Sequence, residues 1–129
     1  MNPINYEEKR KHPRIVVERP ISMVLSTGDI LNTSLYDISL GGVQMHCDKI
    51  TAHKFQYEYE TTKEKGTTRF RVIFKLSFKD HAETLEALCR MVYILKRDQQ
   101  ETYAVGVEFA ELKGENKNIL KKYIESLST

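Results

Sequence analysis

Residues 37–42, with the sequence Asp-Ile-Ser-Leu-Gly-Gly, bring together residue types that can hold a polar ligand. Asp37 offers a carboxylate and Ser39 a hydroxyl group, and both can hydrogen-bond the edge of a ligand. Gly41 and Gly42 carry no side chain, so a backbone or a ligand can approach them closely. Strand-like apolar segments flank the stretch, which predicts a sharp turn between two strands. Taken alone, the pattern is more typical of a tight turn without a ligand.

A basic segment, residues 9–14, lies just upstream of the first apolar run. Arg10 and Arg14 are four positions apart, Lys9 precedes them, and Pro13 restricts the backbone between them. The whole chain has a formal charge of only +2, which is too small to indicate bulk binding to nucleic acid or to a membrane surface. The position of these charges therefore matters more than their sum. A solvated charged surface is the alternative interpretation.

The order and spacing of these two segments resemble the PilZ domain family. An R-x-x-x-R segment at residues 10–14 precedes one strand, and a D-x-S-x-x-G segment at residues 37–42 follows roughly two dozen residues later. Residues 105–109, Val-Gly-Val-Glu-Phe, look like the last strand of that family, so the resemblance covers most of the chain. The resemblance implies a small β-barrel. Because both motifs are complete, it also implies binding of the bacterial second messenger cyclic di-GMP.

The resemblance also implies roles for individual residues. Arg10 and Arg14 match the arginines that contact guanine and phosphate, and a guanidinium fork suits both groups. Asp37 would accept a hydrogen bond from guanine, Ser39 would bind nearby, and Gly42 would leave room for the base. Three further candidates complete the predicted ligand-binding set: Lys9, Gly41 and Arg90. For Arg90, a solvated strand face is the alternative.

The sequence shows no combination of residues typical of a catalytic or metal site. His46 and Cys47 are adjacent, so on a strand they point to opposite faces and cannot form a nucleophile and base pair. The four histidines show no H-x-x-x-H spacing, and nothing suggests a histidine partner for Asp37 and Ser39. We therefore expect a binding protein rather than an enzyme, with no metal and no cofactor.

Composition predicts an ordinary soluble protein. Of the 129 residues, 40% are hydrophobic and 29% are charged, which fits one compact domain. No apolar run is long enough for a transmembrane helix, and the first residues lack the apolar core of a signal peptide. The two cysteines, Cys47 and Cys89, are too few for a disulfide scaffold and are expected as buried free thiols. We therefore expect a cytoplasmic protein.

Hydrophobic periodicity predicts a mainly β chain: an antiparallel barrel of six or slightly more strands with a C-terminal helix at about residues 115–128. Each expected strand has one apolar face. Closure into a barrel would bury these faces in a shared core and remove exposed strand edges. Residues 1–13 are expected as a flexible arm that carries the start of the R-x-x-x-R motif, and residues 14–129 as a single barrel domain. The first strand is expected to bend or break at Pro20.

The middle of the chain is the hardest part to assign. Alternating aromatic residues over 55–59, a polar turn and a second alternating segment over 70–78 predict a hairpin within residues 53–78. Its acidic strand would face its basic strand, with Glu58 or Glu60 opposite Arg71 or Lys75. Residues 85–95 fit both a helical face and a strand face, and the family resemblance favours a strand.

These observations predict a cytoplasmic cyclic di-GMP receptor. Ligand binding would order the N-terminal arm over the barrel, and the signal would pass by contact with a downstream protein. The alternative is a PilZ-like adaptor that works by protein contact without binding nucleotide. A third interpretation is a small barrel that binds single-stranded nucleic acid. The sequence shows no aromatic platform beside the basic cluster, so we do not expect nucleic acid as a partner. Both a monomer and a homodimer are compatible with the sequence.

Overall fold

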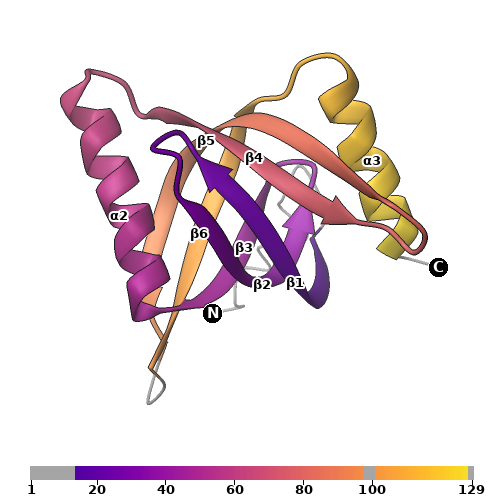
Figure 1. The fold of residues 1–129 in the computed structure, drawn as a ribbon, viewed down its shortest axis with the longest axis horizontal. Helices are drawn as coiled ribbons and strands as arrows, with labels where there is room; N and C mark the ends of the chain where they lie inside the picture. The colour runs from indigo at the N-terminus through magenta and orange to yellow at the C-terminus, as the bar shows by residue number, and fades with distance from the viewer. Residues whose placement is uncertain (1–13, 98–100, 128–129) are drawn as a thin grey trace, which may run out of the picture.

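The computed structural model describes residues 14–97 and 101–127, and within them six strands close into one antiparallel barrel (Figure 1). The order of the strands around the barrel is β1-β2-β3-β6-β5-β4. The strands are β1 (Ile15–Leu25), β2 (Ile30–Ser39), β3 (Gly42–Asp48), β4 (Arg69–Ser77), β5 (Ala82–Lys96) and β6 (Thr102–Glu111). Together with the helix that follows β6, this architecture confirms the predicted fold class.

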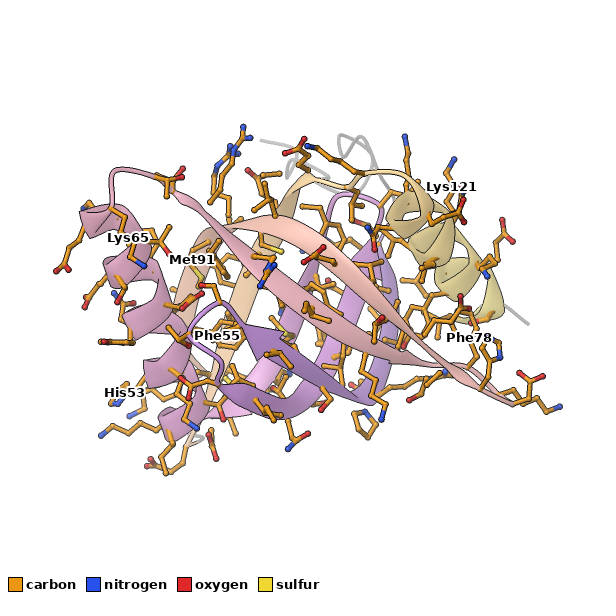
Figure 2. All side chains as sticks on the ribbon, turned by 45° about the horizontal axis from the view of Figure 1, so that its top comes forward. His53, Phe55, Lys65, Phe78, Met91 and Lys121 are labelled. Atoms are coloured by element: carbon orange, nitrogen blue, oxygen red, sulfur yellow. The ribbon has the colours of Figure 1, made fainter. Side chains whose placement is uncertain are left out.

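Two helices pack against the barrel on opposite sides, α2 (Lys49–Glu64) and α3 (Glu115–Leu127) (Figure 1). Helix α3 lies close to the predicted range of residues 115–128, and it buries Leu120 and Tyr123. Helix α2 buries Phe55 on its barrel-facing side, while His53 points away from the barrel (Figure 2). The two helices therefore add to a core that the inward faces of the strands build by alternation.

The predicted hairpin within residues 53–78 is wrong, because residues 49–64 form helix α2. Asp48 caps this helix, with its Oδ1 accepting a hydrogen bond from the backbone N–H of Thr51 at 2.8 Å. Strand β4 pairs with β1 and β5 instead. Glu58 consequently does not face the basic strand, and Arg71 pairs with Glu86 on β5 at 3.2 Å.

The segment at residues 85–95 and the segment around Pro20 are both parts of strands. Residues 82–96 form β5, so the choice of a strand for 85–95 is confirmed. Strand β1 runs through Pro20 without a break, and its irregularity lies slightly earlier, where the pairing with β2 shifts register between Val16 and Arg19. Glu18 in this bulge has a φ of 48°, a left-handed conformation that is uncommon for a residue with a side chain.

Helix length also bears on a membrane location. Among the described residues, no helix is both long and apolar enough to cross a bilayer.

Candidate functional site

Asp37 and Ser39 lie at the end of β2 rather than in a turn, and only Leu40 and Gly41 connect β2 to β3. The register with β3 shifts between Leu35 and Asp37. Leu35 and Ile38 both belong to the core, so this bulge places Asp37 on the outer face of the barrel together with Ser39. The two polar side chains of the motif therefore share one face because the strand is irregular.

The connection itself is held by short backbone contacts. The Oγ of Ser39 accepts a hydrogen bond from the N–H of Gly41 at 3.0 Å. The carbonyl oxygen of Gly41 accepts one from the N–H of Phe109 on β6 at 2.8 Å. At Gly42 a Cβ atom would lie 2.3 Å from the carbonyl oxygen of Val107, so glycine is needed there for the close approach of β6. The turn is thus fixed against the neighbouring strand.

Arg14 stands beside this turn, immediately before β1. Its Nη1 lies 3.7 Å from Oδ2 of Asp37, which forms an ion pair between the two predicted motifs. The Arg14 side chain is 32% exposed, whereas the Asp37 side chain is 9% exposed. Arg10 and Lys9 lie outside the described residues. The structure therefore brings Arg14 next to Asp37, Ser39 and Gly42, which come much later in the sequence.

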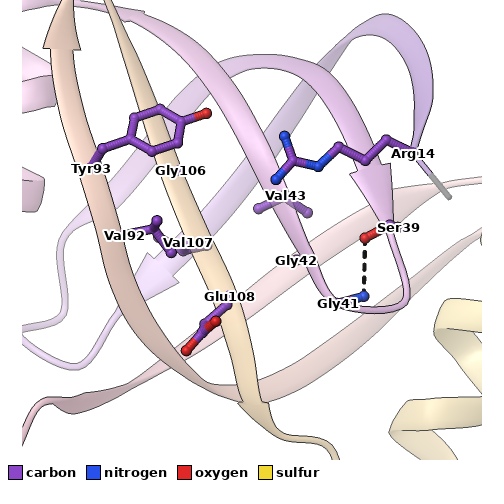
Figure 3. A pocket seen from close by; sticks show the side chains of 10 residues that line it. All are labelled: Arg14, Ser39, Gly41, Gly42, Val43, Val92, Tyr93, Gly106, Val107 and Glu108. Atoms are coloured by element: carbon purple, nitrogen blue, oxygen red, sulfur yellow. Dashed lines mark hydrogen bonds between the residues drawn. The ribbon is translucent and has the colours of Figure 1, made fainter. Parts of the chain in front are cut away.

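A hollow of about 240 Å³ opens on the outer face of the barrel next to these residues (Figure 3). We call it the site hollow and define it by its lining residues: Arg14, Ser39, Gly41, Gly42, Val43, Val92, Tyr93, Gly106, Val107 and Glu108. Four of the predicted ligand-binding residues line it: Arg14, Ser39, Gly41 and Gly42. Asp37 does not line it but forms an ion pair with Arg14, which does. Its other walls come from β5 and β6, two strands that contribute nothing to either motif.

Arg90, like Asp37, is a predicted residue that does not line the site hollow. Its Nη1 donates a hydrogen bond to Oε1 of Glu108 on the adjacent strand β6. Glu108 in turn lines the hollow, so Arg90 contacts a residue of its wall.

Tyr93 and Val92 were missed from the sequence. Gly106 is a signal that could have found them, because a glycine inside a strand can mark a close approach in the sheet. The Tyr93 ring makes that approach, since a Cβ on Gly106 would lie 2.4 Å from its Cε1.

The two cysteines have no role in covalent chemistry at this site. Burial raises the pKa of the Cys47 thiol to about 11 and that of the Cys89 thiol to about 12, so both stay protonated near neutral pH. Both are free and buried, as predicted. Within residues 14–97 and 101–127, no group of three or more His, Cys, Asp or Glu side chains could hold a metal ion.

His46 lies on the outer face of β3 and does not line the site hollow. Burial, and secondarily the charge of Arg97, lowers its pKa below the usual value, which favours the neutral ring. The ring stacks on Tyr36 with 4.3 Å between centroids, and its Nε2 lies 3.3 Å from Nε2 of Gln44. A neutral His46 accepts that hydrogen bond from the Gln44 amide.

Comparison of the sequence with models of known protein families identifies the family of this chain. The family model of the PilZ domain matches residues 8–126, which is most of the chain. The chain belongs to the PilZ domain family. The match includes both the basic segment at residues 9–14 and the Asp37 to Gly42 stretch, so the family predicted from those motifs is confirmed.

Solved structures share the fold of this PilZ domain. The PilZ domain of YcgR from Escherichia coli, solved with c-di-GMP, aligns with a TM-score of 0.58 at 16% identity, over 93% of this chain and 92% of that one. The Bacillus subtilis inhibitor of motility MotI/DgrA aligns with a TM-score of 0.60 at 17% identity, over 88% of this chain and 48% of that one. At such identities the likeness shows the fold alone.

A relative in sequence is an uncharacterized protein of Aquifex aeolicus. It is 24% identical over 107 residues, which cover 74% of this chain and 52% of the relative. This PilZ domain thus spans about half the length of that relative.

Proposed function

We propose that this PilZ domain is a receptor for cyclic di-GMP. The observation that carries the proposal is the meeting of Arg14, Asp37 and Ser39 beside the site hollow, where residues from two separate motifs form one polar cluster. Family membership supports it, as does the likeness in fold to the YcgR domain and the PlzA protein of Borreliella burgdorferi, both solved with c-di-GMP.

Each residue has a role that suits its chemistry. The Arg14 guanidinium donates to a guanine edge or to phosphate oxygens, because its planar fork matches both. The Asp37 carboxylate accepts from guanine N–H groups, and the ion pair with Arg14 orders both groups before the ligand arrives. The Ser39 hydroxyl, already fixed by Gly41, adds a further polar contact.

The charge of the described site falls short of what the ligand requires. Cyclic di-GMP carries two negatively charged phosphates. The positive charge of Arg14 is neutralised by Asp37, and that of Arg90 is neutralised by Glu108. Arg10 and Lys9 would supply the missing positive charge. In this proposal the N-terminal residues fold over the barrel when the ligand binds, and the altered surface signals to a downstream protein in the cytoplasm.

Isothermal titration calorimetry of the full chain tests the proposal, with GTP and cyclic di-AMP as competing ligands. Selective binding of cyclic di-GMP, abolished in Arg14→Ala, is the expected result. Arg71→Ala is the matched control, because Arg71 pairs with Glu86 on another part of the barrel and should leave affinity unchanged. Absence of heat at high ligand concentration would contradict the receptor and leave an adaptor that works by protein contact alone.

A further inference from the structure

Tyr93 forms one wall of the site hollow because β5 contains a bulge. The register of β5 with β6 shifts between Met91 and Tyr93, so Val92 is an extra residue. Met91 and Ile94 both pack against the core, which leaves Val92 and Tyr93 together on the outer face. In a regular strand Tyr93 would share the inward face of Met91. The bulge thus moves a large aromatic ring out of the core and into the hollow.

The ring is held in place from two sides. Beneath it lies Gly106, where a Cβ would come within 2.4 Å of Cε1 and 2.6 Å of Cζ of the ring. At its tip, the Tyr93 hydroxyl donates a hydrogen bond to Oε1 of Gln44 on β3. An aromatic ring over a cross-strand glycine is by itself a stabilising arrangement in sheets. The hydrogen bond from the hydroxyl to Gln44 also fixes the orientation of the ring beside the hollow.

Across the hollow from this ring stands Arg14. Figure 3 shows the Arg14 guanidinium, just before β1, and the Tyr93 ring on β5 extending toward one another. An aromatic ring and a guanidinium plane are the two side-chain types that stack on nucleobases. Both are partly exposed, so both retain surface for a ligand.

We propose that the Tyr93 ring is a stacking platform for one purine base of the ligand. The proposal rests on the proposed receptor function and names a residue that neither motif contains. Stacking depends on the flat face that every base has, so it adds affinity with little selectivity among purines. Discrimination of guanine then belongs to the hydrogen-bonding groups of Arg14 and Asp37.

Calorimetry of three variants tests the platform, again with the full chain and cyclic di-GMP. Tyr93→Leu removes the ring and should weaken binding about ten-fold or more. Tyr93→Phe keeps the ring and loses only the hydroxyl, so its affinity should stay within about three-fold of wild type. Tyr57→Leu is the matched control, because Tyr57 is 61% exposed on α2 and does not line the hollow.

A fluorescence experiment reports stacking directly. The chain contains no tryptophan, so Tyr93→Trp and Tyr57→Trp each create a single indole reporter. A base stacked on an indole quenches its emission. Cyclic di-GMP should quench Tyr93→Trp and leave Tyr57→Trp unchanged.

The results of these experiments distinguish a failure of the Tyr93 platform from a failure of the proposed receptor function. Wild-type binding together with unchanged affinity of Tyr93→Leu overturns the platform and leaves the receptor intact. Absence of wild-type binding overturns both. If Tyr93→Leu fails to fold, Tyr93→Trp decides: quenching supports the platform, and a chain that binds ligand without quenching refutes it.

Discussion

Gly42 and Gly106 are both crowded glycines of the site, but different kinds of atoms crowd them. A Cβ on Gly42 would meet the backbone of β6, at 2.3 Å from the carbonyl oxygen of Val107. The atoms nearest to a Cβ on Gly106 would be those of the Tyr93 ring. A backbone in a closed barrel cannot withdraw easily, whereas a ring can rotate. We therefore expect a larger loss of stability from an added methyl group at Gly42 than at Gly106.

We predict that Gly42→Ala lowers the free energy of unfolding by about 1–3 kcal/mol, because the new methyl group forces β3 and β6 apart. Gly106→Ala should cost less stability and weaken cyclic di-GMP binding, since it displaces the Tyr93 ring. Urea denaturation and calorimetry on both variants check this pair. A Gly42→Ala variant as stable as wild type would contradict the close approach.

Sequence reasoning found the motif side of the site and missed the other side for a physical reason. Arg14, Asp37 and Ser39 could be named because their types and spacing carry chemistry directly. Tyr93 could not, since strict alternation from Cys89 and Met91 assigns it to the core face. A single extra residue reverses that assignment, and nothing local in the sequence marks Val92 as the extra one.

At the scale of elements, helix α2 shows how alternation misleads. Phe55, Tyr57 and Tyr59 suggested a strand, yet Tyr57 is 61% exposed and shares no face with buried Phe55. The buried positions are spaced as in a helix: Ala52, Phe55, Glu58 and Thr62. A glutamate in this set hid the pattern, because charged residues are rarely expected at buried positions. Asp48 as an N-cap was the signal that could have corrected it.

Glu58 is buried because it ties α2 to the turn between β1 and β2. Its side chain is 1% exposed, and its Oε1 accepts hydrogen bonds from the backbone N–H of Ser26, at 3.0 Å, and from the Ser26 hydroxyl. We predict that Glu58→Ala lowers the free energy of unfolding by about 1–3 kcal/mol, since it leaves the Ser26 donors without this acceptor.

The exposed residue Glu64, on the same helix, provides the control for this contact. Chemical denaturation should show little change for Glu64→Ala. Equal losses for both variants would mean that the Ser26 contact contributes nothing specific.

The hairpin between β4 and β5 contains a second polar cluster, centred on His81. The ring stacks on Phe78 with 4.7 Å between centroids, and Phe78 packs edge-on against Tyr123 of α3. Hydrogen bonds to Asp80 and then to Glu83 raise the pKa of His81 above its usual value. Glu83 also accepts from Lys122 of α3 at 3.2 Å. The cluster therefore links the hairpin to the helix through charge.

This raised pKa predicts how stability depends on pH. The folded state holds the His81 proton more tightly than the unfolded chain, so the stabilisation is fully present below about pH 6.5 and is lost as pH rises through the folded value. Thermal unfolding of wild type and His81→Gln should therefore differ more at about pH 6 than at about pH 9. His53→Gln, an exposed site on α2, is the control. A difference that grows with pH would contradict the assignment.

At the scale of the whole molecule, the pairing of β1 with β4 closes the barrel. Strands β1 and β4 pair from Ser22 with Lys75 to Leu25 with Val72, which joins the two edges of the sheet. Alternating faces predicted that the strands share a core, and the family resemblance indicated a barrel. No local pattern could specify which strands meet, because pairing depends on residues far apart in the chain.

Because the site hollow draws residues from before β1 and from β2, β3, β5 and β6, a ligand bound there would contact most strands of the sheet. A ligand that binds only the folded barrel must stabilise all of it, as small domains unfold cooperatively. Cyclic di-GMP at about 100 times its dissociation constant should raise the free energy of unfolding by about 2.7 kcal/mol. Thermal unfolding with and without ligand measures this, with GTP as the control ligand.

The arginine variants show whether this stabilisation arises in the site hollow. Arg14→Ala should lose the ligand-dependent shift, and Arg71→Ala should keep it, because only Arg14 lines the hollow. An equal shift in Arg14→Ala and wild type would place the ligand elsewhere on the barrel. A shift lost only in Arg14→Ala would place the ligand beside Arg14 in the site hollow.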